Sequence, residues 1–274
     1  MSATSMRLAL AQTQIVYQEP MENLTLAVHW MQQAVSCGAQ CILFPEMSFT
    51  GFSMHPEKTV PWGQRSVDTM RAFASAFQLA VGFGYVGTTS DGQYQNHYCV
   101  LDACGKTLTD FVKLHPFSYT GEERIYSPGD TIICGDLCGI PYSTLLCYDL
   151  RFPEVFRLAS QHAHVLIVPA NWLSIRHTQF QLLLRARAIE NQAYVVGINC
   201  VGTQGNNHFL GGSCVVDPEG NVKLDCGNQA ALRLFDLTDD TQQFRASFSC
   251  REDARLSWYS TQYQCAFTED MGGL

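Results

Sequence analysis

Short apolar runs alternate along this chain with longer segments in which apolar residues recur at every third or fourth position. A run such as residues 41–44 has the length of one buried strand, whereas the spacing within residues 21–37 is typical of an amphipathic helix. Pro20 precedes that helix and Gly38 follows it, and both residue types are common at these helix ends. Strands that alternate with helices in this way indicate the α/β class.

The same patterns, followed along the chain, predict the order of its elements. Further helices are expected at residues 67–80 and 176–191, and a hairpin at residues 212–225. The remaining strands are expected at residues 6–16, 81–88, 95–102, 107–113, 144–147, 164–169, 193–200 and 230–235. With no linker or repeat in 274 residues, we expect one domain over residues 1–274, in which residues 237–274 form an irregular C-terminal tail.

Composition excludes several classes of protein. The chain is 46% hydrophobic and 15% charged, which is typical of a packed globular protein. Its net charge of −8, without a basic stripe, argues against nucleic acid as a partner. No segment approaches the ~20 apolar residues of a membrane span. Because a chain of this size has ample core without disulfides, the twelve cysteines are expected to be reduced, and we expect a cytoplasmic protein.

Two cysteine pairs have a spacing loosely similar to that of zinc ligands, Cys37 with Cys41 and Cys134 with Cys138. Neither pair is followed by a second His or Cys pair at a matching distance, as a structural zinc site requires. We therefore expect no metal.

A dinucleotide-binding motif is matched by Gly82, Gly84 and Gly87, with Asp102 about 20 residues further on. In that motif the glycines open a helix whose N-terminus binds the pyrophosphate. Here turn residues follow the glycines, so a strand that packs closely against a neighbouring element is the better interpretation. No cofactor is expected.

Cys147 lies at a predicted strand-to-helix corner, because residues 144–147 are apolar and Phe152-Pro153-Glu154 opens a helix. Most free cysteines are small core residues. A thiol at such a corner can instead be a nucleophile, provided that a neighbouring group accepts its proton.

Two other strand ends supply a carboxylate and an ammonium. Glu46 follows Pro45 after the strand at residues 41–44, where partial burial would suit a carboxylate to proton transfer. Lys113 ends the strand at residues 107–113 and could place its charge beside a developing oxyanion. Each alone would be an ordinary loop or surface residue. The carboxyl ends of strands, however, are where α/β sheets tend to build their sites.

The order Glu46, Lys113, Cys147 resembles the Glu–Lys–Cys set of the nitrilase superfamily of carbon–nitrogen hydrolases. The first two residues are 67 apart and the last two 34 apart, which fits that superfamily. The likeness extends from Arg7 to about Trp258 and includes the segments Pro169-Ala-Asn-Trp172, Arg185-Ala-Arg-Ala-Ile-Glu-Asn-Gln192 and Gly212-Ser-Cys-Val-Val-Asp-Pro218. Within the superfamily, Cys147-Tyr-Asp-Leu-Arg-Phe-Pro and the segment around Ala186 are most similar to the omega-amidase branch.

This resemblance implies a four-layer α-β-β-α sandwich and a role for each site residue. Glu46 would be the general base and acid, and Cys147 the nucleophile. Lys113 and the backbone N–H of Tyr148 would stabilise the oxyanion. The second glutamate of the family corresponds best to Glu122 and would position the lysine and the substrate nitrogen.

The implied activity is the hydrolysis of a small ω-amide of a dicarboxylic or 2-oxo acid, through a cysteine thioester. Trp172 and Asn171 would line the substrate site, and Arg176 or another cation near Trp172 could receive the far carboxylate. An N-carbamoyl-amide hydrolase, a nitrilase and an inert binding member of the fold remain alternatives. A Cys–His hydrolase is disfavoured because no peptidase signature surrounds Cys147.

The resemblance also implies a homodimer or a higher homo-oligomer, to which the C-terminal tail contributes. Two departures from the family pattern bear on these expectations. Pro116 stands where relatives usually have leucine, so the loop after Lys113 can take another path. The tail segment at residues 244–250 contains no proline, whereas relatives tend to have one.

Overall fold

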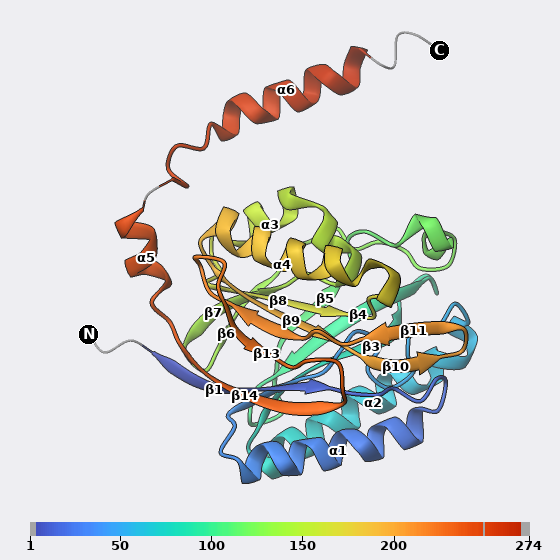
Figure 1. Ribbon diagram of the computed structural model, residues 1–274. Coiled ribbons are helices and arrows are strands. Elements are labelled where there is room, and N and C mark those ends of the chain that lie inside the picture. Colours follow the sequence, from blue (N-terminus) through green and yellow to red (C-terminus); the bar gives the residue numbers. More distant parts are fainter. Residues whose placement is uncertain (1–3, 249, 270–274) are drawn as a thin grey trace.

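Two six-stranded sheets stack face to face in the computed structural model, which describes residues 4–248 and 250–269, and helices cover both outer faces (Figure 1). The layers run helix, sheet, sheet, helix. This arrangement confirms the four-layer α-β-β-α sandwich expected from the sequence.

The first sheet has the strand order β14-β1-β2-β3-β4-β5. Its centre is parallel, because β1 pairs with β2 and β2 with β3 in the same direction. The bounds are β1 Ser5–Gln12, β2 Cys41–Leu43, β3 Ala80–Thr88, β4 Tyr94–Leu101, β5 Thr107–Val112 and β14 Ala231–Thr238.

The second sheet has the order β13-β12-β9-β8-β7-β6, with β7, β8 and β9 parallel. Its bounds are β6 Cys134–Leu137, β7 Ile140–Thr144, β8 Val165–Ala170, β9 Tyr194–Asn199, β12 Cys214–Val216 and β13 Val222–Asp225. The predicted hairpin is confirmed as β12 and β13, which pair antiparallel. A separate two-stranded ribbon consists of β10 (Val201–Gln204) and β11 (Asn207–Leu210).

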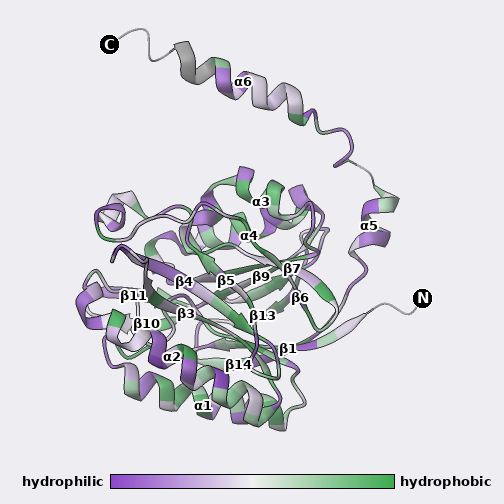
Figure 2. Ribbon diagram, turned by 180° about the vertical axis from the view of Figure 1, so that it is seen from behind, coloured by the Kyte–Doolittle hydropathy of each residue, from purple (hydrophilic) through white to green (hydrophobic). Residues whose placement is uncertain are grey.

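Helices α1 (Pro20–Ser36) and α2 (Pro56–Phe77) pack on the first sheet, and α3 (Pro153–Ala159) and α4 (His177–Asn191) pack on the second. One apolar core fills the space between the sheets and continues under α3 and α4, and another lies under α1 and α2. Figure 2 shows the apolar residues on the inward faces of the helices and the hydrophilic ones outside.

The second helix begins at Pro56, eleven residues earlier than the predicted start at residue 67. Its first half lacks an apolar stripe and packs through small residues instead. A side chain at Gly63 would meet the carbonyl oxygen of Val86 at 2.1 Å, so only glycine allows the helix to lie this close to β3. Helical periodicity in the sequence starts only where larger apolar residues are used.

The strand predicted at residues 144–147 is wrong in its bounds, since β7 ends at Thr144. Leu145 and Leu146 are fully buried but lie beyond the ladder, and Cys147 opens a 3-10 helix (Cys147–Arg151). The prediction also omitted β6, β10 and β11, whose sequences are polar or glycine-containing and do not resemble buried strands.

The C-terminal tail is not irregular as expected, because two helices form there, α5 (Thr241–Ser247) and α6 (Leu256–Glu269). Helix α6 lies outside the four layers, above α3 in Figure 1, and the Tyr263 hydroxyl donates to Glu154 of α3 at 3.1 Å. Its residues alternate between polar and aromatic without a clear apolar face, which is why the sequence indicated little helix. Within the described ranges, no helix combines the length and the apolarity that are needed to cross a bilayer.

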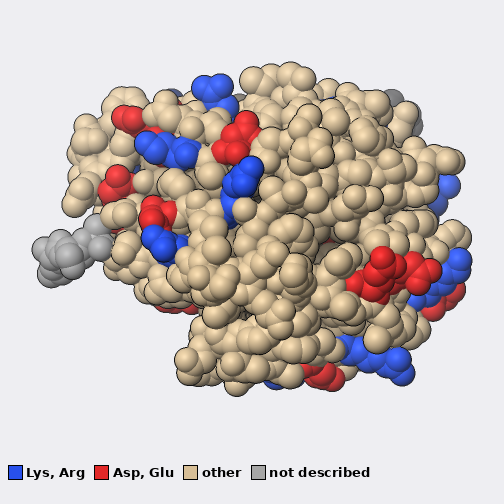
Figure 3. Space-filling view, turned by 60° about the horizontal axis from the view of Figure 1, so that its bottom comes forward, with Lys and Arg blue, Asp and Glu red and all other residues tan. Residues whose placement is uncertain are grey.

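Charged side chains do not gather by sign on the face shown in Figure 3. Acidic and basic groups lie interspersed there, often as neighbouring pairs, around large uncharged areas.

Candidate active site

The three residues singled out at strand ends meet at one edge of the sandwich, between the two sheets. Glu46 lies three residues beyond β2, Lys113 directly follows β5, and Cys147 lies three residues beyond β7. The first two come from one sheet and the third from the other. The site therefore exists only because the sheets stack with these edges together.

The Lys113 ammonium lies between two carboxylates. Its Nζ is 3.0 Å from Glu46 Oε1, and 3.0 and 2.9 Å from the two oxygens of Glu122. All three side chains are buried, with at most 2% of the Lys113 side chain exposed. Burial lowers the pKa of Lys113, but the charges of Glu46 and Glu122 outweigh it and raise this pKa well above its ordinary value. Lys113 is therefore a permanent cation.

The two adjacent glutamates after Lys113 differ completely in their surroundings. Glu122 is fully buried, and its Oε2 also accepts the backbone N–H of Phe117 at 2.6 Å. Glu123 points away, and its carboxylate pairs with the exposed Arg124 at 3.4 Å. The loop that leaves Lys113 through Pro116 thus returns to the site at Glu122.

Glu46 is held by donors at both carboxylate oxygens. Oε1 accepts from Lys113 and from Asn96 Nδ2 at 2.9 Å, and Oε2 accepts the backbone N–H of Asn171 at 3.0 Å. The backbone here packs tightly against β3, because a side chain at Gly84 would lie 2.3 Å from the Met47 nitrogen. This close packing explains why glycine stands at position 84 in the motif that resembled a dinucleotide-binding site. That motif forms the continuous strand β3, as the sequence interpretation held.

Cys147 adopts a left-handed backbone conformation, with φ of +49°, which is uncommon for a residue other than glycine. Only 9% of the residue is exposed. Burial and the carboxylate of Glu46 raise the pKa of its thiol well above the ordinary value, and the charge of Lys113 opposes them. The resting side chain is therefore a thiol, which needs a base at the moment of attack.

Asp149 joins the cysteine turn to the lysine loop. Its fully buried carboxylate accepts the backbone N–H of Leu146 at 2.8 Å and that of His115 at 2.9 Å. The ring of His115 also contacts it, with Nδ1 2.8 Å from Oδ1. One side chain thereby sets the position of the residues next to both Cys147 and Lys113.

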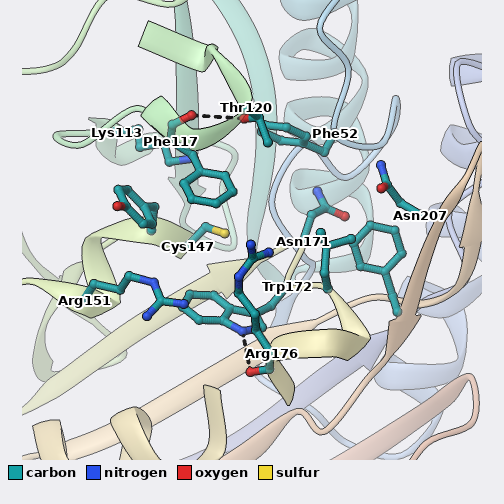
Figure 4. Close-up of a pocket in the computed structure, with 13 residues that line it drawn as sticks. Phe52, Lys113, Phe117, Thr120, Cys147, Arg151, Asn171, Trp172, Arg176 and Asn207 are labelled. Carbon is teal, nitrogen blue, oxygen red and sulfur yellow. Dashed lines mark hydrogen bonds between the residues drawn. The ribbon is translucent and has the colours of Figure 1, made fainter. Parts of the chain in front are cut away.

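A cavity of about 80 Å³ opens onto Cys147. The three residues expected at the substrate site, Asn171, Trp172 and Arg176, all line it (Figure 4). Tyr148 lines it as well. The other lining residues are Phe52, Lys113, Phe117, Thr120, Arg151, Leu173, Asn207 and Phe209.

Two arginines give this otherwise largely aromatic cavity a positive charge. The Arg176 guanidinium lies over the rings of Phe117 and Tyr119, at 5.5 and 5.2 Å from their centres. Arg151 lies 4.9 Å from the ring centre of Trp172. Within the described ranges neither forms an ion pair, so their charges are free to meet an anionic group of a substrate.

Sequence analysis missed Asn96, Asp149 and Arg151. Asp149 and Arg151 belong to the same motif as Cys147, so their place in that motif could have identified them as site residues. Asn96 stands in a strand with no neighbouring motif, and nothing in the sequence placed it at the site.

A buried thiol and a permanently charged ammonium that line a small cavity, with a buried carboxylate beside them, define the class as a cysteine-dependent hydrolase. Comparison with known families makes this specific. The chain belongs to the carbon–nitrogen hydrolase family, which matches residues 7–246. The expected membership of the nitrilase superfamily is thereby confirmed.

Similar proteins include amidases from several bacteria. The chain is 32% identical to an omega-amidase of Escherichia coli over 84% of this chain and 88% of that protein. It is 29% identical to a 2-oxoglutaramate amidase of Bacillus subtilis over 90% and 97% of the two chains. A solved variant of the amidase from Nesterenkonia sp. superposes with a TM-score of 0.85, at 26% identity, over 95% of this chain and 97% of that one. In that variant the acetamide moiety of fluoroacetamide is attached to the active-site cysteine.

Proposed function

We propose that this protein hydrolyses a small ω-amide of a dicarboxylic or 2-oxo acid to the carboxylate and ammonia. The observation that carries the proposal is the buried thiol of Cys147 beside Glu46 and Lys113, in a cavity whose wall also holds Arg151 and Arg176. The names of the two relatives, an omega-amidase and a 2-oxoglutaramate amidase, support the same substrate class.

The reaction begins with the transfer of the Cys147 proton to Glu46. The sulfur then attacks the amide carbon, and the negative charge that develops on the carbonyl oxygen is stabilised by Lys113 and the backbone N–H of Tyr148. A donor preorganised at this position typically contributes ~3–4 kcal/mol to the transition state. When the intermediate collapses, the C–N bond breaks, and Glu46 returns the proton to the leaving nitrogen as ammonia departs.

Water completes the cycle. Glu46 takes a proton from water, the resulting hydroxide attacks the thioester carbon, and the C–S bond breaks to release the carboxylic acid product. The proton held by Glu46 returns to the Cys147 sulfur. The net reaction consumes one water for each amide, and Glu122 keeps the lysine charge in place throughout.

The acidic end of the substrate is proposed to lie against Arg176, with Arg151 close by. Guanidinium groups bind carboxylates through two parallel hydrogen bonds, and a site that is partly desolvated strengthens this attraction. Trp172 fixes the backbone of Arg176, because its indole N–H donates to the Arg176 backbone carbonyl at 2.8 Å. Asn171 fixes the backbone of Glu46, because its side-chain nitrogen donates to the Glu46 backbone carbonyl at 2.7 Å.

A panel of small amides tests the proposal. We expect ammonia from monoamides of short dicarboxylic or 2-oxo acids, with kcat/KM at least tenfold above that of a neutral amide of equal length. Carbon dioxide from N-carbamoyl substrates would favour the carbamoyl hydrolase, and turnover of nitriles would favour the nitrilase. If the protein binds amides without releasing ammonia, it is an inert member of the fold.

Beyond its substrate, we propose that the protein is a homodimer or a higher homo-oligomer and has no nucleic-acid or membrane partner. Helix α6 supports self-association, because Leu256, Trp258 and Tyr263 are about half exposed on a helix outside the layers. The net charge of −8, and the interspersed charges on the face shown in Figure 3, support the absence of a nucleic-acid partner. Buried thiols such as Cys41 and Cys200 are consistent with a reducing cytoplasm.

Sedimentation equilibrium would measure the oligomeric state, and a mass of one chain at micromolar concentration would contradict the dimer.

A further inference from the structure

Asn96 on β4 contacts all three charged residues of the site. Its side-chain nitrogen donates to Glu46 Oε1 at 2.9 Å and to Glu122 Oε1 at 3.3 Å, and its backbone carbonyl accepts the N–H of Lys113 at 2.9 Å. The residue is 1% exposed. Its position in the strand directs the side chain into the site, and the neighbouring His97 to the opposite face of the sheet.

Among residues 4–248 and 250–269, no donor reaches the carbonyl end of the same side chain. Asn96 Oδ1 is buried there without a hydrogen bond from these residues, although buried acceptors are almost always satisfied. Turning the amide over would place this oxygen against two carboxylates, so the network defines its orientation.

The two oxygens of Glu46 are consequently unequal. Oε1 accepts from both Lys113 and Asn96, whereas Oε2 accepts the backbone N–H of Asn171, and the Cys147 thiol also interacts with this carboxylate. That same N–H also interacts with the thiol of Cys147. Oε2 is therefore the oxygen on the side of the nucleophile, and it is the less saturated of the two.

We propose that Asn96 is a positioning residue that holds Glu46 and Glu122 on either side of the Lys113 ammonium and leaves Glu46 Oε2 to exchange the proton with Cys147. The inference rests on the proposed reaction. When both carboxylates are ionised, they exceed the lysine charge by one, and the Asn96 amide supplies the additional donor between them. The titratable groups that face Glu46 are Lys113, Glu122, Cys147 and Cys200.

Two substitutions distinguish this role from simple packing. Asn96→Ala removes the donor and leaves space, whereas Asn96→Asp keeps the shape but replaces the donor with a third acidic group. Asn191→Ala is the matched control, because Asn191 is also 1% exposed and hydrogen bonded, but lies at the end of α4 away from the site.

We expect Asn96→Ala to lower kcat for amide hydrolysis by ~10–100-fold, the range for loss of a group that orients a catalytic residue, with KM changed less than about threefold. Asn96→Asp should lose at least as much. In Asn96→Ala the acid limb of the kcat/KM profile should move to higher pH, since the ionised carboxylate has lost a donor. Asn191→Ala should lower the melting temperature without moving this profile.

Alkylation of Cys147 by fluoroacetamide provides a second readout that needs no turnover. Its rate should fall in both Asn96 variants, with the same displacement of the acid limb in Asn96→Ala. An aspartate variant that is more active than the alanine variant, with an unmoved pH profile, would mean that Asn96 only fills space. If the wild type is alkylated but hydrolyses no amide, the proposed function fails, and the alkylation rates alone still decide the role of Asn96.

Discussion

Both carboxylate oxygens of Glu122 lie within hydrogen-bond distance of the Lys113 ammonium, at 3.0 and 2.9 Å, and both side chains are buried. A buried lysine keeps its charge only where carboxylates compensate its desolvation. In the proposed reaction, the charge of Lys113 thus depends on Glu122, a residue that does not itself have to contact the carbonyl oxygen of the substrate.

Glu122→Gln should therefore lower kcat by ~10²-fold or more, since it removes this electrostatic partner at constant size. Glu123→Gln is the matched control. Because Glu123 lies outside the site beside Arg124, its loss should change kcat by less than about threefold. Steady-state ammonia release measures both, with melting curves to exclude unfolding. An inactive Glu123 variant beside an active Glu122 variant would contradict the assignment.

Fluoroacetamide should attach to Cys147 in preference to the exposed cysteines. The amide group of the reagent is expected to enter the cavity and place its carbon at the sulfur, whereas a thiol such as that of Cys104 is exposed and does not line this cavity. Peptide mapping after limited reaction should find one modified residue, and activity should fall in proportion. Cys147→Ser should remain unlabelled. Full activity after complete modification of Cys147 would disprove the mechanism.

Arg176→Gln should weaken the use of acidic amides selectively. Its guanidinium lines the cavity and has no ion-pair partner in the part of the chain that the structure describes, so its loss should cost about tenfold in kcat/KM for a monoamide of a dicarboxylic acid, which is ~1.4 kcal/mol. A neutral amide of equal length serves as the internal control and should change by less than about threefold. Equal losses for both substrates would indicate a structural role for Arg176.

Asp239 should make stability depend on pH. Burial raises the pKa of its carboxyl, but the hydrogen bond with His164, at 2.6 Å, the charge of His164 and the backbone N–H of Thr241 together outweigh burial and lower the pKa below its ordinary value. A lowered pKa in the folded state stabilises the protein above the unfolded value of ~3.9, and this stabilisation is lost as the pH falls through the folded value.

Asp239→Asn should accordingly lower the melting temperature at pH 6 by ~2–4 °C, as expected for about 1 kcal/mol in a chain of this size, and the difference should shrink below about pH 4. Asp236→Asn is the control from the same end of β14. Its carboxylate pairs with Arg7 at the exposed surface, where solvent screening leaves ion pairs with little effect on stability. A constant difference between wild type and Asp239→Asn across the pH range would contradict the linkage.

Several features followed from the sequence because they depend on local patterns. Helix α1 was predicted within one residue at each end, since its apolar stripe, Pro20 and Gly38 all lie within it or beside it. The strand predicted at residues 107–113 likewise ends within one residue of β5, which ends at Val112. Where a helix packs through small residues, as α2 does at Gly63, the sequence shows no apolar periodicity. The prediction therefore missed the start of this helix.

The amino-acid sequence by itself determined the family, the order of most strands and helices, and the residue types of the site, because these depend on local composition and on the order Glu46, Lys113, Cys147. Only the tertiary structure decided that Asn96 bridges two carboxylates, that the Glu46 oxygens are unequal and that Arg151 shares the cavity with Arg176. These contacts join residues from separate strands and both sheets. Their distances depend on strand register and on how the sheets stack, which no local pattern specifies.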